Sequence, residues 1–173
     1  NTVPDASGTP LSRTSIWSSS GFTVQKLLSA QCASTSHPDM RTFLTDLRSG
    51  GEGWALTSRD SGRILASRVL PAFDSETRRT GLLKHTSLDP GVAMVIAPTN
   101  AIHTFFMKFP IDVAFIAKDG RILKICANLP AWRMAAAWGG YAVAEVAAGS
   151  FAAANIVAGD TLCVTPGSQA PAR

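Results

Sequence analysis

The sequence is poor in cysteine, in histidine and in charged residues. It holds three cysteines and three histidines among 173 residues, and only 16% of the residues are charged. No two cysteines form a CxxC pair, which excludes a multi-disulfide scaffold and a standard structural zinc site. The histidines also lack the spacing of metal ligands, so we expect neither a metal site nor a bound cofactor.

Long apolar runs and a strong charge of one sign are missing as well. Lys108 and Asp112 interrupt the best apolar stretch, so no segment reaches the roughly eighteen apolar residues of a membrane span. The net charge of +4 is small and dispersed, which does not favour nucleic-acid binding. We therefore expect no transmembrane segment and no nucleic-acid partner. The sequence starts at Asn1 without a signal-peptide hydrophobic region, and cytoplasmic and exported locations both stay open.

The motifs of common enzyme classes are absent too. The sequence contains no nucleophile elbow, P-loop, zincin helix or dinucleotide-binding fingerprint. An enzymatic activity is therefore not indicated, although a Ser-His-Asp arrangement is not excluded by sequence.

Composition divides the chain into an arm, a domain and a tail. Residues 1–42 include fifteen Ser or Thr and few apolar residues, so they offer little surface to bury and we expect a flexible arm. Residues 43–166 have the apolar content of one globular domain. Residues 167–173 are expected to form a tail.

Many short apolar runs in the domain are typical of strands, and turn residues separate them. Asp60 to Gly62 and Asp119-Gly120 predict two hairpin turns, the second with the strongest signal. Asp74 or Ser75 can cap a short helix. The pattern predicts a mainly β (α+β) domain, a small barrel or sandwich of short antiparallel strands with one or two short helices.

Once these segments are placed in order, residues 54–164 resemble the bacterial and archaeal family named domain of unknown function 192 (DUF192). Five segments carry the resemblance: TRRTGLLKHTSLDPGVAMVI, IHTFFMKFPIDVAFIAKDGRILKI, PAWR, YAVAEVAAGS and IVAGDTL. Leu83 and Phe109 depart slightly from the commonest family pattern but keep its apolar character. The resemblance implies a compact mainly β domain and no particular reaction. The IHTFF…FPID segment is similar to a subgroup linked with pilus-assembly loci, which makes an association with pilus or envelope machinery an expectation.

The segment IHTFFMKFPID places polar side chains inside an apolar run. If it were one alternating strand, His103 would share a face with Phe105 and Met107, while Lys108 would point the other way. His103 then has two interpretations. It is either a hydrogen-bonded, partly buried imidazole or a ligand-binding group or general base.

Two carboxylates are candidates for a site. Asp112 follows a proline bend and either accepts backbone N–H bonds there or lies at a pocket mouth. Glu145 interrupts an apolar strand and, if it faces inward, needs a partner such as Arg79 or Arg133. Two carboxylates in one cleft could divide general acid and base roles, as in glycoside hydrolysis.

The PAWR segment contributes aromatic and cationic groups. Trp132 and Arg133 on a loop suit recognition of a protein or a small ligand, although Trp132 and Trp138 could instead cap one end of the fold. A hairpin at Asp119-Gly120 would bring this loop close to Asp112.

Two functions of different classes follow from these residues. The first is a non-enzymatic binding or accessory domain whose ligand, a protein or a small molecule, contacts His103, Asp112, Trp132, Arg133 and Glu145. The second is a small hydrolase or carbohydrate-active enzyme that uses Asp112 and Glu145 as a carboxylate pair. The sequence favours the binding domain and predicts neither its ligand nor its oligomeric state.

Overall fold

We describe a computed structural model of the chain over residues 43–48 and 53–167. The predicted arm, residues 1–42, and all of the predicted tail except Gly167 lie outside the described residues. No helix among the described residues is long and apolar enough to cross a membrane.

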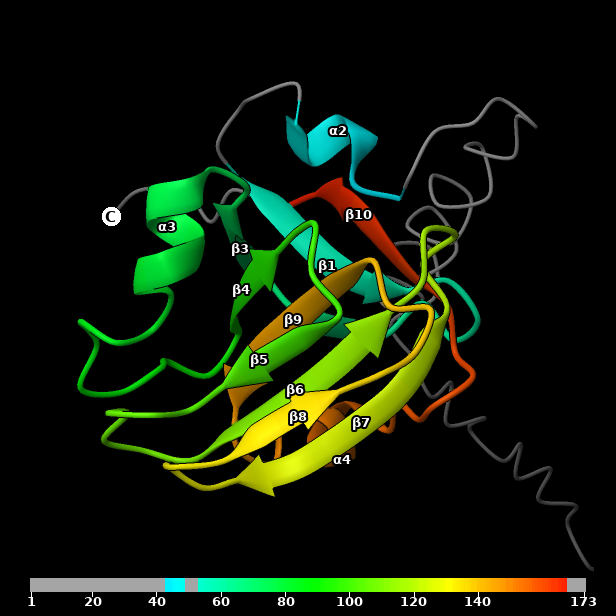
Figure 1. Ribbon diagram of the computed structural model, residues 1–173. Helices are drawn as coiled ribbons and strands as arrows, with labels where there is room; N and C mark the ends of the chain where they lie inside the picture. Colours follow the sequence, from blue (N-terminus) through cyan, green and yellow to red (C-terminus); the bar gives the residue numbers. More distant parts are fainter. Residues whose placement is uncertain (1–42, 49–52, 168–173) are drawn as a thin grey trace, which may run out of the picture.

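The strands of the described residues form three open sheets (Figure 1). A three-stranded sheet has the order β10-β1-β2, with β1 Trp54–Ser58, β2 Ile64–Ala66 and β10 Leu162–Pro166. The central sheet has five strands in the order β3-β4-β9-β6-β7, with β3 Arg68–Ala72, β4 Val92–Ile96, β6 Ile111–Ile116, β7 Ile122–Leu129 and β9 Ala142–Ala147. A two-stranded ribbon pairs β5 Ala101–His103 with β8 Met134–Ala136.

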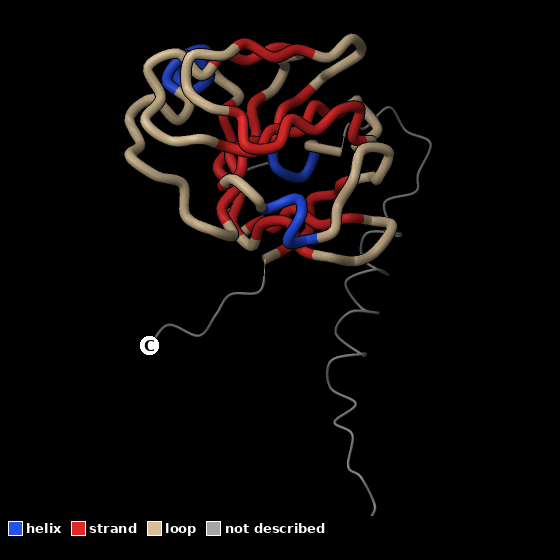
Figure 2. The backbone as a smooth tube through the Cα atoms, turned by 90° about the horizontal axis from the view of Figure 1, so that it is seen from below, coloured by secondary structure: helices blue, strands red, loops and turns tan. Residues whose placement is uncertain are grey.

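These sheets stack as layers around the five-stranded sheet (Figure 2). One face of that sheet packs against the three-stranded sheet, and the first core fills this interface with Leu56, Leu65, Leu162, Val95, Ile116 and Val146. Helices α2 (Thr45–Arg48) and α4 (Ser150–Ala154) also contribute to this core through Leu47 and Phe151. The first core therefore has the form of a β-sandwich.

The opposite face of the five-stranded sheet carries a second core. Its side chains come from the sheet (Val92, Met94, Ile96, Val113, Phe115, Val143) and from the segments that cover it (Leu82, Leu88, Met107). The ribbon packs against this face through Ile102 and Ala135. Helix α3 (Ser75–Thr80) is followed by the segment that contributes Leu82 and Leu88 to the same core. This face is thus covered by loops and a ribbon rather than by a continuous sheet.

The mainly β (α+β) fold class is confirmed, and its sandwich form is the one observed. The barrel is not observed, because the sheets have free edges and do not close. Not all neighbours are antiparallel, since β3 and β4 run parallel. The α3 helix lies in the connection between these two strands, as a parallel crossover requires. The described residues contain three short helices, whereas one or two were expected.

Local turn signals predicted their elements correctly. Antiparallel β1–β2 and β6–β7 pairs flank the two hairpin turns. Gly120 has φ of 94°, and a Cβ there would lie 2.3 Å from the carbonyl oxygen of Leu162, so only glycine fits this turn. Asp74 caps α3, and its Oδ1 accepts the Thr77 N–H at 2.9 Å. Hydrogen bonds from Thr77 lower the pKa of this carboxyl.

The cysteines differ in state. Cys126 carries a free thiol. Cys163 is disulfide-bonded, which the cysteine spacing did not predict.

Candidate functional site

The IHTFFMKF segment does not continue as one strand, so the predicted alternation from Ile102 to Lys108 is wrong. Strand β5 ends at His103, and the chain turns just after Thr104, at Phe105 and Phe106. The Thr104 hydroxyl is buried, donates to the Pro130 carbonyl at 2.7 Å and accepts the Arg133 N–H at 2.9 Å. This side chain ties the turn to the PAWR loop and stops the strand.

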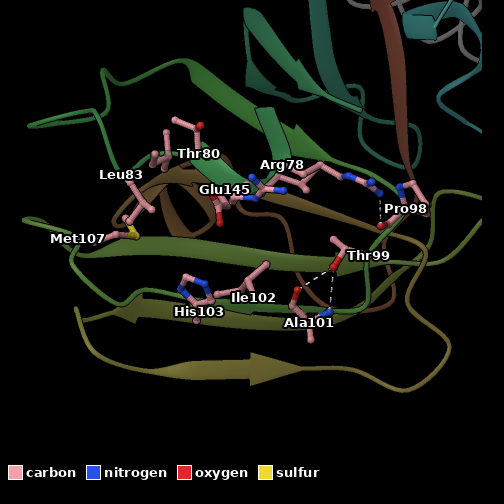
Figure 3. Close-up of a pocket in the computed structure, with 14 residues that line it drawn as sticks. Arg78, Thr80, Leu83, Pro98, Thr99, Ala101, Ile102, His103, Met107 and Glu145 are labelled. Atoms are coloured by element: carbon pink, nitrogen blue, oxygen red, sulfur yellow. Dashed lines mark hydrogen bonds between the residues drawn. The ribbon is translucent and has the colours of Figure 1, made fainter. Parts of the chain in front are cut away.

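A cavity of about 390 Å³ lies on the second-core face of the five-stranded sheet (Figure 3). One wall is formed by residues 78–83, at the end of α3 and just after it, and the facing wall by residues 101–103 of the ribbon. Arg78 Nη1 donates to the Pro98 carbonyl at 3.3 Å, which links the end of α3 to the segment that enters the ribbon. The lining is apolar at Leu82, Leu83, Ile96, Ile102 and Met107 and polar at Arg78, Arg79, Thr80, Thr99, His103 and Glu145.

Glu145 lies at the base of this cavity. It is on β9 between Met94 of β4 and Val113 of β6, with only 4% of its surface exposed. Burial raises the pKa of its carboxyl to about 7. In Figure 3 its side chain is directed into the space between α3 and the ribbon.

The expected ion pair of Glu145 is not formed with any described residue. Arg79 lines the same cavity but makes no ion pair with the carboxylate, and desolvation is the sole cause of the raised pKa. Arg133 does not line this cavity. Its side chain donates instead to the Trp132 carbonyl at 3.3 Å. Glu145 is thus a buried acid with an open side toward the cavity.

Asp112 is buried as well, but its oxygens have backbone partners. Oδ1 accepts the Asn128 N–H at 2.8 Å and Oδ2 accepts the Phe151 N–H at 3.3 Å. The first bond holds the irregular register between β6 and β7 beside Asn128, and the second joins β6 to the start of α4. The structural interpretation, an aspartate that pins a bend, describes this geometry.

The two candidate carboxylates lie on opposite faces of one sheet. Asp112 is paired with Val146 and Glu145 with Val113, so each carboxylate shares a face with its partner. Val146 belongs to the first core and Val113 to the second. A carboxylate pair acting on one bond needs both groups in one cleft, and the structure does not assemble that pair.

Aromatic rings form a cluster at the end of the ribbon. His103 stacks on Phe105 with ring centroids 5.0 Å apart, and Phe105 lies 5.8 Å from Trp132. Trp132 meets Phe106 edge-on at 4.7 Å. His103 thus connects this cluster to the cavity that it also lines. The structure brings His103, Trp132 and Arg133 together and leaves Asp112 on the other face.

The cavity residues that the sequence did not single out for a site include Arg78, Thr80, Leu83 and Met107. A helix between two strands is the signal for a parallel crossover that lays the helix over the sheet. That signal would have placed the residues after α3 above β4 and β9.

Comparison with known proteins agrees with this architecture. The model of the DUF192 family, described as "Uncharacterized ACR", matches residues 56–164. The chain belongs to the DUF192 family. No curated protein matches it.

Two solved structures share the fold of this chain. A protein of unknown function from Novosphingobium aromaticivorans is 24% identical with a TM-score of 0.56, over 64% of this chain and 82% of that one. A protein from Sinorhizobium meliloti, described as "a putative transcription regulator", is also 24% identical with a TM-score of 0.57, over 64% of this chain and 91% of that one. At this identity the likeness concerns the fold alone.

Proposed function

We propose that this DUF192 domain is a non-enzymatic binding domain whose ligand is a small amino-acid-like molecule held in the cavity beside Glu145. The observation that carries the proposal is a buried carboxyl, with no ion pair to any described residue, at the base of a preformed cavity. Burying an ionisable group without a partner is costly, and a ligand amine would supply the missing partner.

The lining suits a compact ligand with two polar ends. A volume of about 390 Å³ is at the small end of the range for small-molecule sites. Glu145 at the base would accept hydrogen bonds from an amine. Arg78 and Arg79 in the α3 wall would meet a carboxylate, since guanidinium groups bind carboxylates with two parallel hydrogen bonds. Leu83, Ile102 and other apolar residues would contact the rest of the ligand.

A binding domain of this kind would serve as an accessory component of a larger assembly. The likeness of the IHTFF…FPID segment to a subgroup linked with pilus-assembly loci supports pilus or envelope machinery as the setting that we propose. The carboxylate-pair hydrolase lacks comparable support, because Asp112 is engaged by two backbone N–H groups on the other face.

A thermal-shift screen with free amino acids tests the proposed ligand class. We expect amino acids with apolar side chains to raise the melting temperature of the wild-type chain, and their N-acetyl and amide derivatives to lose this effect. N-acetylation removes the amine intended for Glu145, and amidation removes the carboxylate intended for the arginines.

Two matched variants test whether the rise in melting temperature depends on Glu145. Glu145→Gln should abolish the shift, whereas Glu76→Gln, an exposed glutamate in the first turn of α3, should retain it. A shift that survives in Glu145→Gln, or no shift with any amino acid, contradicts the proposal.

A further inference from the structure

The end of the ribbon exposes three large apolar side chains together. We call Phe106, Trp132 and Met134 the aromatic tip; they are 68%, 57% and 73% exposed. Phe106 and Trp132 are in edge-on contact. Met134 pairs with His103 across the ribbon, so it lies on the same face as the imidazole that begins the ring cluster. The tip therefore combines two rings in contact, one from the turn after β5 and one from the PAWR loop, with the first side chain of β8.

The backbone presents these rings outward. Phe106 has φ of 65° and Trp132 has φ of 62°, a left-handed conformation that is rare for bulky residues. Thr104 holds both loops in place, since its backbone carbonyl accepts the Trp132 N–H at 2.9 Å and its hydroxyl accepts the Arg133 N–H. The exposure of the rings is thus fixed by hydrogen bonds from both loops to the buried Thr104.

The charge of the two loops has one sign. Residues 104–110 and 130–134 contain Lys108 and Arg133 and no aspartate or glutamate, and both cations are exposed. A surface that combines exposed aromatic rings with cations and lacks anions is complementary to a negatively charged lipid headgroup layer.

We propose that the aromatic tip docks this domain onto anionic phospholipid membranes. Phe106, Trp132 and Met134 enter the interfacial region, and Lys108 and Arg133 contact the headgroup phosphates. Trp132 is suited to this position because its ring is apolar and its N–H can reach water or phosphate. The tip also leaves the cavity free, since none of its three residues lines it.

The shape favours a membrane over a peptide as the partner. The three tip residues line neither the Glu145 cavity nor the second cavity, which includes Trp138 and Tyr141. A peptide would gain from a groove with pockets for its side chains, whereas protruding rings suit insertion into a lipid surface.

Co-sedimentation of the full chain with lipid vesicles tests the proposal. One vesicle type contains phosphatidylcholine alone, and the other contains about one third phosphatidylglycerol. We expect binding to the anionic vesicles only. Trp132→Ala should weaken this binding by about tenfold, and replacement of Lys108 and Arg133 by Gln should weaken it about fivefold for each cation.

The chain supplies matched controls for both kinds of change. Trp138 is 98% exposed and lies outside the ring cluster, so Trp138→Ala should bind as the wild type does. Gln replacements at the exposed Arg59 and Arg68 control for the loss of two positive charges.

Three results would overturn the proposal. They are no sedimentation with anionic vesicles, equal binding by wild type and Trp132→Ala, and equal losses in the tip variants and their controls. Self-association that Trp132→Ala removes, without vesicle binding, would assign the tip to a protein interface instead.

Discussion

The two faces of the five-stranded sheet each bury one carboxylate, and they surround it differently. On the sandwich face, Asp112 accepts the N–H groups of Asn128 and Phe151. On the ribbon face, Glu145 is buried with no ion pair to a described residue and lines a cavity. The two groups sit on neighbouring strands, one residue apart in register.

The difference separates a stabilising acid from an acid that is available for binding. Charge-assisted hydrogen bonds make Asp112 favourable for folding, whereas burial makes the ionised form of Glu145 unfavourable. Natural sites often retain groups that cost stability where function needs them. The ribbon face is therefore where we place the ligand site.

Replacement of Asp112 by Ala should cause the largest loss of stability. It removes two charge-assisted hydrogen bonds and leaves two backbone N–H groups without acceptors, so we expect the free energy of unfolding to fall by about 3–5 kcal/mol. Urea unfolding measures the loss, and Asp89→Ala, at an exposed aspartate, should change little. A loss below about 1 kcal/mol would show that Asp112 does not hold the bend.

Replacement of Glu145 by Gln should act in the opposite direction and depend on pH. Because the folded pKa is raised from 4.5 to about 7, the folded state holds a proton that the unfolded state releases. The stability contributed by protonated Glu145 is thus fully present below pH about 4.5 and is lost as pH rises through about 7. The shift corresponds to roughly 3 kcal/mol, so Glu145→Gln should be more stable than wild type by about that amount above pH 8.

Unfolding curves of both proteins across this pH range provide the measurement. The difference between them should be constant in acid, change from pH about 4.5 to 7 and level off above it. A difference that does not vary with pH would show that the pKa of Glu145 is not raised, because the carboxyl is solvated or already paired.

Replacement of Thr104 by Val should have an intermediate effect. The change keeps the shape of the side chain but removes its hydrogen bonds to Pro130 and Arg133, so we expect a loss of about 1–2 kcal/mol. Thr86→Val at an exposed position is the control. If the two variants are equally stable in urea, the two loops of the aromatic tip are held by other contacts.

Replacement of Trp132 by Ala should have the smallest effect on stability. Its ring is 57% exposed and contacts mainly other rings of the cluster. The free energy of unfolding should therefore fall by no more than about 0.5 kcal/mol. Trp138→Ala is again the matched control. Unfolding of the Trp132 variant would mean that this residue belongs to the core and caps the fold.

Much of the fold could be predicted because its signals are local. Asp119-Gly120 specifies a hairpin through the conformation of glycine, and Asp74 caps a helix through a contact with the next turn. The same hairpin returns the chain beside Asp112, where the Asn128 N–H donates to Oδ1, although Trp132 and Arg133 lie with the aromatic cluster and not beside Asp112. In each case the decisive partners are close in sequence or related by one turn.

The site could be predicted only in part because its geometry depends on distant partners. Strand β5 ends at His103 because Thr104 bonds to Pro130, 26 residues away, and no local pattern shows this. The parallel pairing of β3 and β4 places the end of α3 over Glu145, so the cavity wall comes from Arg78 to Leu83. Charge alone suggested Arg133 as a partner for Glu145, but in the fold Arg133 lies beside Trp132 in the aromatic cluster.

The most direct test of the contrast between the two faces is the pKa of the Glu145 carboxyl, measured by carbon-13 NMR of the side-chain carboxyl as pH is varied. The chain contains three glutamates, and the signal that is absent in Glu145→Gln identifies this one. We expect a midpoint at about pH 7, with a lower midpoint in the presence of a bound amine. A midpoint at or below 4.5, the ordinary value for this carboxyl, would contradict the account, because it would mean that Glu145 is solvated or already paired.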